Sequence, residues 1–315
     1  MLSRYPARVI AALSRARRRT LLMPREWPVY FALMSSGAKN TDPANPLRDP
    51  AQLAEPAIRL YLDLLKRSLT NTLFEVEPDA DQDNVPRFVH GFIRHYINGS
   101  AVSMLPVKRF EHLQSCIEDI LARGIVGDLI EAGVWRGGAT IFMRAALKAY
   151  GSTDRTVWVA DSFEGLPEPD AERFPLEAKA HQGPVMTKTY NHLAVSLEEV
   201  QRNFRAYGVL DEQVRFLKGW FKDTLPDAPI ESLAIMRLDG DFYESTRDGL
   251  VNLYDKLSIG GYAIVDDYGE TSWTYCRKAV DEFREERGIV EPLVRVDSKC
   301  HFWRKLRHAT KQKSD

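Results

Sequence analysis

The strongest constraint on the fold is an alternation of short apolar segments with amphipathic ones in the second half of the chain. Segments with strand character alternate with stretches that repeat apolar residues at helical spacing. This order predicts an α/β fold in which helices cover both faces of a mostly parallel, seven-stranded sheet. Ligands of such a sheet bind beyond the carboxyl ends of its strands. The predicted strands are 127–133, 156–161, 214–217, 233–238 and 262–265, with a closing pair at 293–296 and 301–303, and the predicted helices are 139–150, 197–207, 249–257 and 275–287.

Other segments surround this alternating region. The chain opens with clustered arginines and continues into a stretch rich in Pro, Asn and Gly, which predicts a basic, mobile arm. Two amphipathic stretches follow, at 55–75 and 107–123, and Gly124 is a typical stop for the second helix. The predicted division is a basic arm at 1–50, a helical N-terminal subdomain at 51–124, the alternating domain at 125–306 and a basic tail at 307–315.

One connection breaks the alternation. Residues 162–196 are rich in Pro, charged residues and His, and they show no clear period. Loops of this length in compact domains are usually lids, binding loops or disordered segments. We expect a substrate lid, with a disordered insertion as the alternative. His181 and His192 lie in this segment, and each is either a catalytic base or a surface residue.

Charge and cysteine content narrow the class of protein. The chain has 43 Lys and Arg against 44 Asp and Glu, a formal net charge of -1, whereas a protein that coats nucleic acid needs a surplus of cations. No apolar run approaches the roughly 20 residues that cross a bilayer. Cys116, Cys276 and Cys300 are scattered without metal-ligand spacing, so we expect reduced thiols in a cytoplasmic protein. The basic arm is either a solvated tail or a weak contact with an anionic membrane surface or acidic partner.

A glycine-bearing motif occupies the first strand-to-helix turn. Residues 131–138 read Glu-Ala-Gly-Val-Trp-Arg-Gly-Gly, in which Gly133 would let a ligand approach the backbone. The spacing differs from the G-x-G-x-x-G of dinucleotide binders, and a turn that only packs helix on strand is the alternative. Asp161 ends the second predicted strand, where a carboxylate accepts hydrogen bonds from ribose hydroxyls, or else caps the following turn. Together these features favour an adenosine-bearing ligand.

Four carboxylates follow two predicted strands. Asp239 and Asp241 come directly after 233–238, and Asp266 and Asp267 after 262–265. Gathering these anions at one edge of the sheet costs several kcal/mol unless a cation neutralises them. All-oxygen ligands favour Mg2+, Mn2+ or Ca2+ over zinc. The pattern therefore predicts a divalent metal site, with solvated acids that cap loops as the alternative.

These motifs resemble those of the macrocin O-methyltransferase family, sugar O-methyltransferases of antibiotic biosynthesis that include mycinamicin and novobiocin tailoring enzymes. The resemblance runs from about residue 128 to 303 and rests on 131–138, 157–163, 219–226, 239–246 and 265–268. It implies a class I methyltransferase (Rossmann-like) fold that binds S-adenosylmethionine and Mg2+. The implied site comprises Glu131, Ala132, Gly133, Val134 and Trp135 at the methionine end, Asp161 and Ser162 at the ribose, Gly219 and Trp220 beside the adenine, Asp239, Asp266 and Asp267 as metal ligands, and Asp241 as general base.

The implied activity is methylation of a sugar hydroxyl on a glycosylated natural product or glycan. A metal ion would lower the pKa of that hydroxyl, and Asp241 would take its proton before in-line transfer of the methyl group. Two other functions stay open, an O-methyltransferase of catechols or other vicinal diols and a non-catalytic methyltransferase-like scaffold. Because sugar-tailoring relatives are often oligomers, the resemblance also implies a homo-oligomer.

Overall fold

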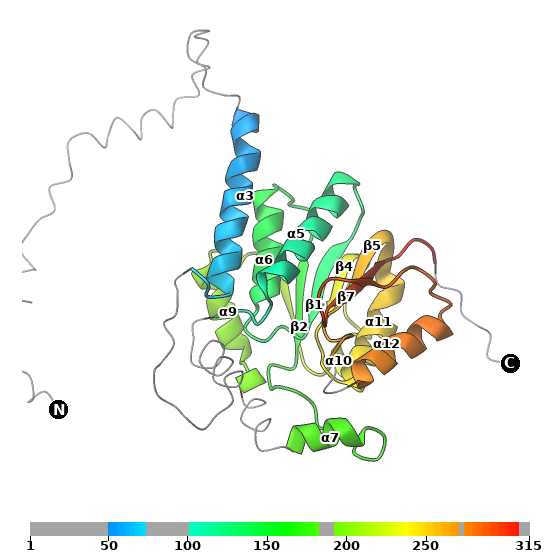
Figure 1. Ribbon diagram of the computed structural model, residues 1–315. Coiled ribbons are helices and arrows are strands. Elements are labelled where there is room, and N and C mark those ends of the chain that lie inside the picture. The colour runs from blue at the N-terminus through cyan, green and yellow to red at the C-terminus, as the bar shows by residue number, and fades with distance from the viewer. Residues whose placement is uncertain (1–49, 74–100, 183–191, 271–273, 309–315) are drawn as a thin grey trace, which may run out of the picture. The chain divides into compact units, whose positions relative to one another are not determined.

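The computed structural model describes residues 50–73, 101–182, 192–270 and 274–308 (Figure 1). Their seven-stranded sheet has the order β3-β2-β1-β4-β5-β7-β6, and β7 runs antiparallel to both of its neighbours. The order reverses beside β1, which places a ligand crevice at the carboxyl ends of β1 and its neighbours. The predicted fold is confirmed. The strands are β1 Asp128–Ala132, β2 Val157–Asp161, β3 Val214–Lys218, β4 Leu233–Leu238, β5 Leu257–Val265, β6 Val294–Arg295 and β7 His301–Arg304.

Helices cover both faces of the sheet (Figure 1). Residues of β1 and β2 alternate between the two resulting cores. On β1, Leu129 belongs to the core shared with α3, α5, α6 and α9, whereas Ile130 belongs to the core shared with α11 and α12. This is the period of two of a strand buried on both faces. The helices are α3 Pro50–Leu69, α5 Val107–Ala122, α6 Gly138–Ala149, α9 Leu197–Ala206, α11 Tyr243–Leu253 and α12 Tyr275–Glu286.

Some element bounds differ from the predicted ones for local reasons. The helix predicted at 55–75 ends at Leu69, shortly before Asn71 takes a left-handed backbone with φ 54°. The helix predicted at 249–257 begins at Tyr243, and Leu257 already starts β5. Gly260, with φ 89°, and the adjacent Gly261 interrupt the apolar pattern of β5, which hid its first half from the sequence analysis.

The long connection at 162–196 is not structureless. It contains the helix α7 (Pro175–Gln182), while residues 183–191 lie outside the described residues. The backbone N–H groups of Glu172 and Arg173 donate to the Asp170 carboxylate before the helix, and the ring of Phe174 stacks on Tyr243 at 4.6 Å. Tertiary contacts therefore support α7, which explains why its sequence carries little helical period. A second short helix, α10 (Phe221–Thr224), was not predicted either.

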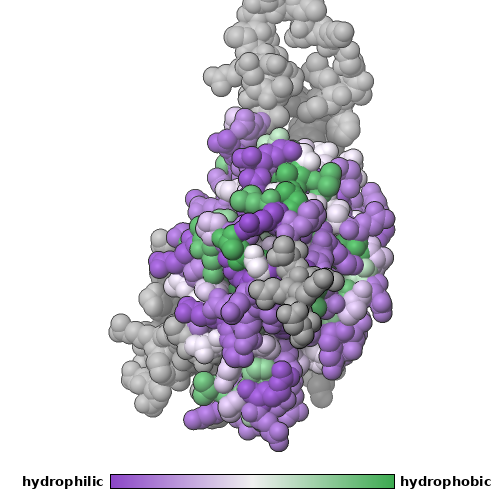
Figure 2. Space-filling view, turned by 90° about the vertical axis from the view of Figure 1, so that its right-hand side faces the viewer, coloured by the Kyte–Doolittle hydropathy of each residue, from purple (hydrophilic) through white to green (hydrophobic). Residues whose placement is uncertain are grey.

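The surface of the described residues is mixed. Hydrophilic residues dominate the face that Figure 2 shows, and apolar residues form small groups among them. Among the described helices, none combines the length and the apolar character that a membrane crossing needs. The predicted basic arm, apart from Pro50, and the tail after His308 lie outside the described residues, as does the predicted membrane contact of the arm.

Candidate active site

The acids predicted at the strand ends come together. Asp239, Asp266 and Asp267 each offer a carboxylate oxygen, and these oxygens lie within 4.8 Å of one another. The chain continues strand pairing past the strand ends, since the Asp239 N–H donates to Ala132 and the Asp266 N–H donates to Leu238. Oδ2 of Asp267 is buried and accepts no hydrogen bond from the described residues. This edge of the sheet therefore presents a buried carboxyl oxygen that has no hydrogen-bond partner among the described residues.

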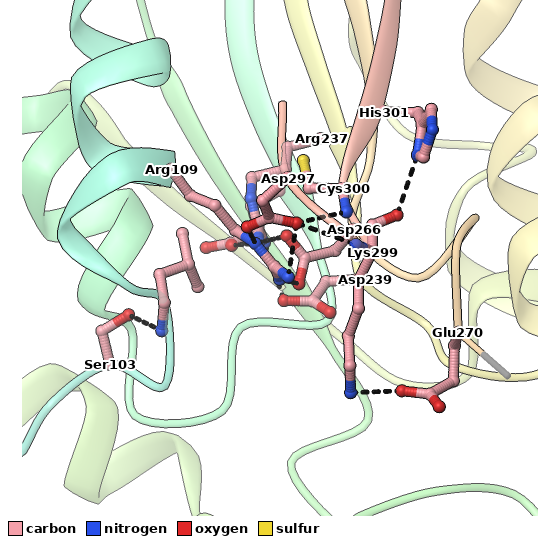
Figure 3. A network of polar contacts seen from close by, with 12 residues as sticks. Ser103, Arg109, Arg237, Asp239, Asp266, Glu270, Asp297, Lys299, Cys300 and His301 are labelled. Carbon is pink, nitrogen blue, oxygen red and sulfur yellow. Dashed lines mark hydrogen bonds and ion pairs between the residues drawn. The ribbon is translucent and has the colours of Figure 1, made fainter. Parts of the chain in front are cut away.

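A buried arginine lies among these acids. Arg237 of β4 is 2% exposed, and its guanidinium donates to Glu131, to Asp266 and, over 2.8 Å, to Asp239 (Figure 3). Burial alone would lower the pKa of Arg237, but the three carboxylates hold it well above its ordinary value. The metal ion predicted from the sequence is therefore not the sole source of positive charge, because the guanidinium of Arg237 already neutralises part of the cluster.

A second arginine reaches the cluster from α5. Arg109 donates through Nη1 to Oδ2 of Asp266, and through Nε and Nη2 to the carboxylate of Asp297, over 2.7 and 3.1 Å. Asp297 lies in the turn between β6 and β7, and the N–H groups of Lys299 and Cys300 also donate to it. Although burial opposes the shift, these hydrogen bonds lower the pKa of Asp297 to about 2. Asp266 thus receives a guanidinium on each oxygen.

These arginines were missed in the sequence analysis for different reasons. Arg237 is the one charged residue of a strand that is otherwise apolar. A cation in a buried strand needs a buried anionic partner, so the position of Arg237 in the sequence could have predicted a contact with the nearby acids. Arg109 gave no signal, because 157 positions separate it from Asp266.

Asp241 lies close to the metal-ligand candidates, but neither Arg109 nor Arg237 donates a hydrogen bond to it. Its backbone is left-handed, with φ 57°, an uncommon conformation outside glycine. Burial raises the pKa of Asp241 to about 8, and the nearby charges of Asp239 and Asp266 add to the shift. Burial and Asp241 likewise raise the pKa of Asp267. The carboxylates of the cluster outnumber its guanidiniums, so the residues present fit an additional divalent cation.

A pocket of about 550 Å³ lies at the carboxyl ends of β1, β2 and β4, and Asp239 is the metal-ligand candidate that lines it. Gly133 has φ 90°, and a side chain there would lie 2.0 Å from the backbone oxygen of Asp239. Glycine is therefore required where the end of β1 meets the end of β4. Predicted residues that line the pocket are Gly133, Asp161, Ser162, Trp220 and Asp239.

The other residues of the glycine motif support the pocket rather than line it. Glu131 is buried against Arg237, Ala132 and Val134 are buried in the core, and the indole N–H of Trp135 donates to the backbone oxygen of His192. A side chain at Gly138 would collide with Ser103, so this glycine allows close packing at the start of α6. The packing alternative is thus part of the motif's role.

Asp161 and Ser162 are engaged in the loop that they begin. Asp161 accepts hydrogen bonds from the N–H groups of Val134 and Phe163, and the hydroxyl of Ser162 donates to the backbone oxygen of Gly165. The contact with Phe163 is the local turn that was the alternative for Asp161. Of the two lid histidines, His181 lies on α7 with its ring 6.4 Å from that of Phe242, and neither His181 nor His192 lines the pocket.

The reversal of strand order at β1, with a pocket and acids at the carboxyl edge, is the architecture of a class I methyltransferase. Residues 96–305 match the family model described as Macrocin-O-methyltransferase (TylF). The chain therefore belongs to the macrocin O-methyltransferase family, a family of S-adenosylmethionine-dependent enzymes, and is an O-methyltransferase. The predicted family and enzyme class are confirmed, and the non-catalytic scaffold was wrong.

Similar proteins extend over most of the chain. It is 47% identical over 261 residues to the 8-demethyl-8-(2,3-dimethoxy-alpha-L-rhamnosyl)-tetracenomycin-C 4'-O-methyltransferase of Streptomyces olivaceus, which covers 80% of this chain and 95% of the relative. It is 44% identical over 268 residues to the demethyldecarbamoylnovobiocin O-methyltransferase of Streptomyces niveus, and the match covers 83% of this chain and 99% of that relative. The solved structure of the O-methyltransferase NovP matches with a TM-score of 0.68 at 45% identity, covering 79% of this chain and 100% of that one.

Proposed function

We propose that this O-methyltransferase is metal-dependent and methylates a sugar hydroxyl of a glycosylated natural product. The observation that carries the proposal is the group of carboxylate oxygens of Asp239, Asp266 and Asp267, within 4.8 Å of one another beside the 550 Å³ pocket. The acceptor class is supported by relatives named for a rhamnosyl tetracenomycin, for demethyldecarbamoylnovobiocin and for mycinamicin III, at 44–47% identity.

The pocket suits S-adenosylmethionine. Asp161 and Ser162 would hold the ribose, and Gly219 and Trp220 would border the adenine. At the methionine end, Gly133 lines the pocket while Ala132, Val134 and Trp135 hold its loop in place. Glu131 would act at this end from behind the pocket lining, where it is buried against Arg237 and its Oε2 has no partner among the described residues.

Asp239, Asp266 and Asp267 would hold the divalent ion, Mg2+ in the proposal, because hard cations prefer carboxylate oxygens. When both are bound, S-adenosylmethionine supplies an electrophilic methyl group and the ion lowers the pKa of an acceptor hydroxyl. Asp241 would accept the hydroxyl proton. Without a cation the pKa of Asp241 is raised to about 8, and a nearby cation favours the ionised form that a general base needs.

The acceptor class is tested with labelled S-adenosylmethionine and Mg2+. The acceptors are demethyldecarbamoylnovobiocin and mycinamicin III, taken from the relatives' names, and catechol for the vicinal-diol alternative. Methylation of a glycoside and not of catechol is expected, and the reverse would favour the alternative. If none is methylated, mass spectrometry of metabolites with and without the gene should reveal a product that differs by one CH2 group.

The role of Asp241 is tested in the same assay. Asp241→Asn should lower kcat by about 10²- to 10⁴-fold, the usual contribution of a general base, while leaving the affinity for S-adenosylhomocysteine nearly unchanged. Near-normal turnover of this variant at saturating Mg2+ would remove Asp241 from the mechanism.

A further inference from the structure

Arginines from two different elements hold both oxygens of Asp266. Arg237, from β4 inside the sheet, donates to Oδ1, and Arg109, from the first turn of α5, donates to Oδ2. Figure 3 shows the two guanidiniums converging on this carboxylate. The side chain of Arg109 is 11% exposed, so its contact with Asp266 lies largely out of water.

Arg109 is itself held in place by Asp297. Its Nε and Nη2 form a two-pronged contact with the two oxygens of Asp297, over 2.7 and 3.1 Å. Asp297 cannot turn freely, because the N–H groups of Lys299 and Cys300 both donate to its Oδ1 over 2.9 Å. A further hydrogen bond of 2.8 Å, from the Gly269 N–H to the Lys299 oxygen, joins this turn to the loop after β5. The guanidinium of Arg109 is thus fixed at one end before it meets Asp266 at the other.

We propose that Arg109, oriented by Asp297, is a positioning residue that fixes the carboxylate of Asp266 for metal binding. The inference rests on the metal site of the proposed function. A carboxylate that accepts a guanidinium hydrogen bond on each oxygen cannot rotate, yet each oxygen keeps a lone pair for a cation. Helix α5, which precedes the sheet in the chain, thereby forms part of the metal centre.

Geometry and charge predict opposite effects of losing Arg109. Removing a cation near the site would by itself strengthen the binding of a metal ion, whereas releasing Asp266 would weaken it. The double variant Arg109→Met with Asp297→Asn removes one positive and one negative charge, so the net charge stays constant while the support of Asp266 is lost. Arg109→Lys keeps the charge and loses the two-pronged contact.

The experiment measures Mn2+ binding to the full-length, metal-free protein by electron paramagnetic resonance. Both variants should bind Mn2+ about tenfold or more weakly than wild type, the usual effect of removing a partner of a metal ligand. Calorimetric binding of S-adenosylhomocysteine without metal should stay unchanged and reports an intact fold.

The matched control is the pair Arg144 and Asp211, another buried two-pronged contact, with both hydrogen bonds at 2.7 Å, between α6 and the turn before β3. Arg144→Met with Asp211→Asn should leave Mn2+ affinity at the wild-type value. Unchanged or tighter Mn2+ binding by the Arg109 variants would overturn the inference, as would an equal loss in the control. If the double variant does not fold, Arg109→Lys alone decides.

Asp267→Asn separates this inference from the proposed function. It should abolish Mn2+ binding, because it neutralises a ligand whose Oδ2 is buried and unpartnered within the described residues. If Asp267→Asn binds Mn2+ like wild type, the metal site itself is wrong. If it abolishes binding while the Arg109 variants bind normally, the site stands and the positioning role fails.

Discussion

Among single residues, Arg237 links the largest number of acids at the site. It contacts Glu131, Asp239 and Asp266, of which Glu131 is fully buried. A buried ion pair contributes little net stability relative to apolar packing, but removal of one partner leaves the others charged and without compensation. The stability of this edge of the sheet therefore depends on the arginine.

Arg237→Met should reduce the free energy of unfolding in metal-free buffer by about 3–5 kcal/mol, the usual cost of breaking a buried pair. Urea denaturation measures it. The control is Arg123→Met, since Arg123 is 58% exposed and pairs with Asp119 one helical turn away, a contact worth about 0.2–1 kcal/mol. Equal losses in the two variants would show that the acids do not need Arg237.

Gly133 tests whether the meeting of β1 and β4 requires glycine for space as well as for backbone angle. Gly151 has a similar backbone, with φ 73°, but no heavy atom lies within 4 Å of an added side-chain carbon. Gly151→Ala should cost about 1–2 kcal/mol in unfolding free energy from the left-handed backbone alone. Gly133→Ala adds a collision with Asp239, a further cost of about 1–3 kcal/mol. Equal losses in urea denaturation would refute the collision.

At the level of elements, the acids at the strand ends could be predicted from the sequence, whereas the contacts that hold these acids in place could not. Asp239, Asp241, Asp266 and Asp267 follow apolar strands, and topology alone brings such strand ends to one edge. The contact between Arg109 and Asp266 depends instead on how α5 packs, which no local period records. Helix α7 shows the same limit, because the buried side chains of Phe174, Glu177 and Ala178 matter more to it than local spacing.

Helix α7 also completes the start of α11. The cap residue of α11, Phe242, provides no side-chain acceptor, and the Tyr243 N–H donates instead to Glu177 of α7 over 2.9 Å. Glu177 is 1% exposed, and its Oε2 has no partner among the described residues. Burial raises the pKa of Glu177 to about 7, and Glu244 adds to the shift while the Tyr243 amide opposes it. The start of α11, which follows Asp241, is therefore held by a hydrogen bond to the carboxyl group of Glu177, a residue of the predicted lid.

Glu177→Gln should stabilise the protein increasingly as the pH rises. Because the pKa of Glu177 in the folded protein lies above its ordinary value of 4.5, the folded state binds more protons between about pH 4.5 and 7. The free energy of unfolding of wild type therefore falls as the pH rises through this window. Glutamine keeps an acceptor oxygen for the Tyr243 N–H and carries no charge that would be buried. The free energy of unfolding of the variant should exceed that of wild type by at least about 1 kcal/mol near pH 8 and by less near pH 5.

Urea denaturation at several pH values measures this gap. The control, Glu172→Gln, changes an exposed carboxylate just before α7 and should leave stability unchanged at each pH. A gap for Glu177→Gln that stays constant or narrows with rising pH would contradict the assignment.

At the scale of the whole molecule, the near-zero net charge conceals an uneven distribution. The sequence balances 43 basic against 44 acidic residues, yet the carboxyl edge of the sheet gathers more carboxylates than the two arginines neutralise. The fold buries α3 and α5 in the same core as the sheet, so the helical segment before residue 124 contributes to this edge through Arg109. A metal ion at this edge would complete the charge balance.

Anomalous X-ray scattering from crystals of the full-length protein grown with Mn2+ and S-adenosylhomocysteine tests this central claim most directly, because it needs no knowledge of the acceptor. The account predicts an anomalous peak bonded to carboxylate oxygens of Asp239, Asp266 and Asp267, with S-adenosylhomocysteine in the adjoining pocket. A pocket that holds S-adenosylhomocysteine beside carboxylates without such a peak, at Mn2+ concentrations that saturate other magnesium enzymes, would contradict it.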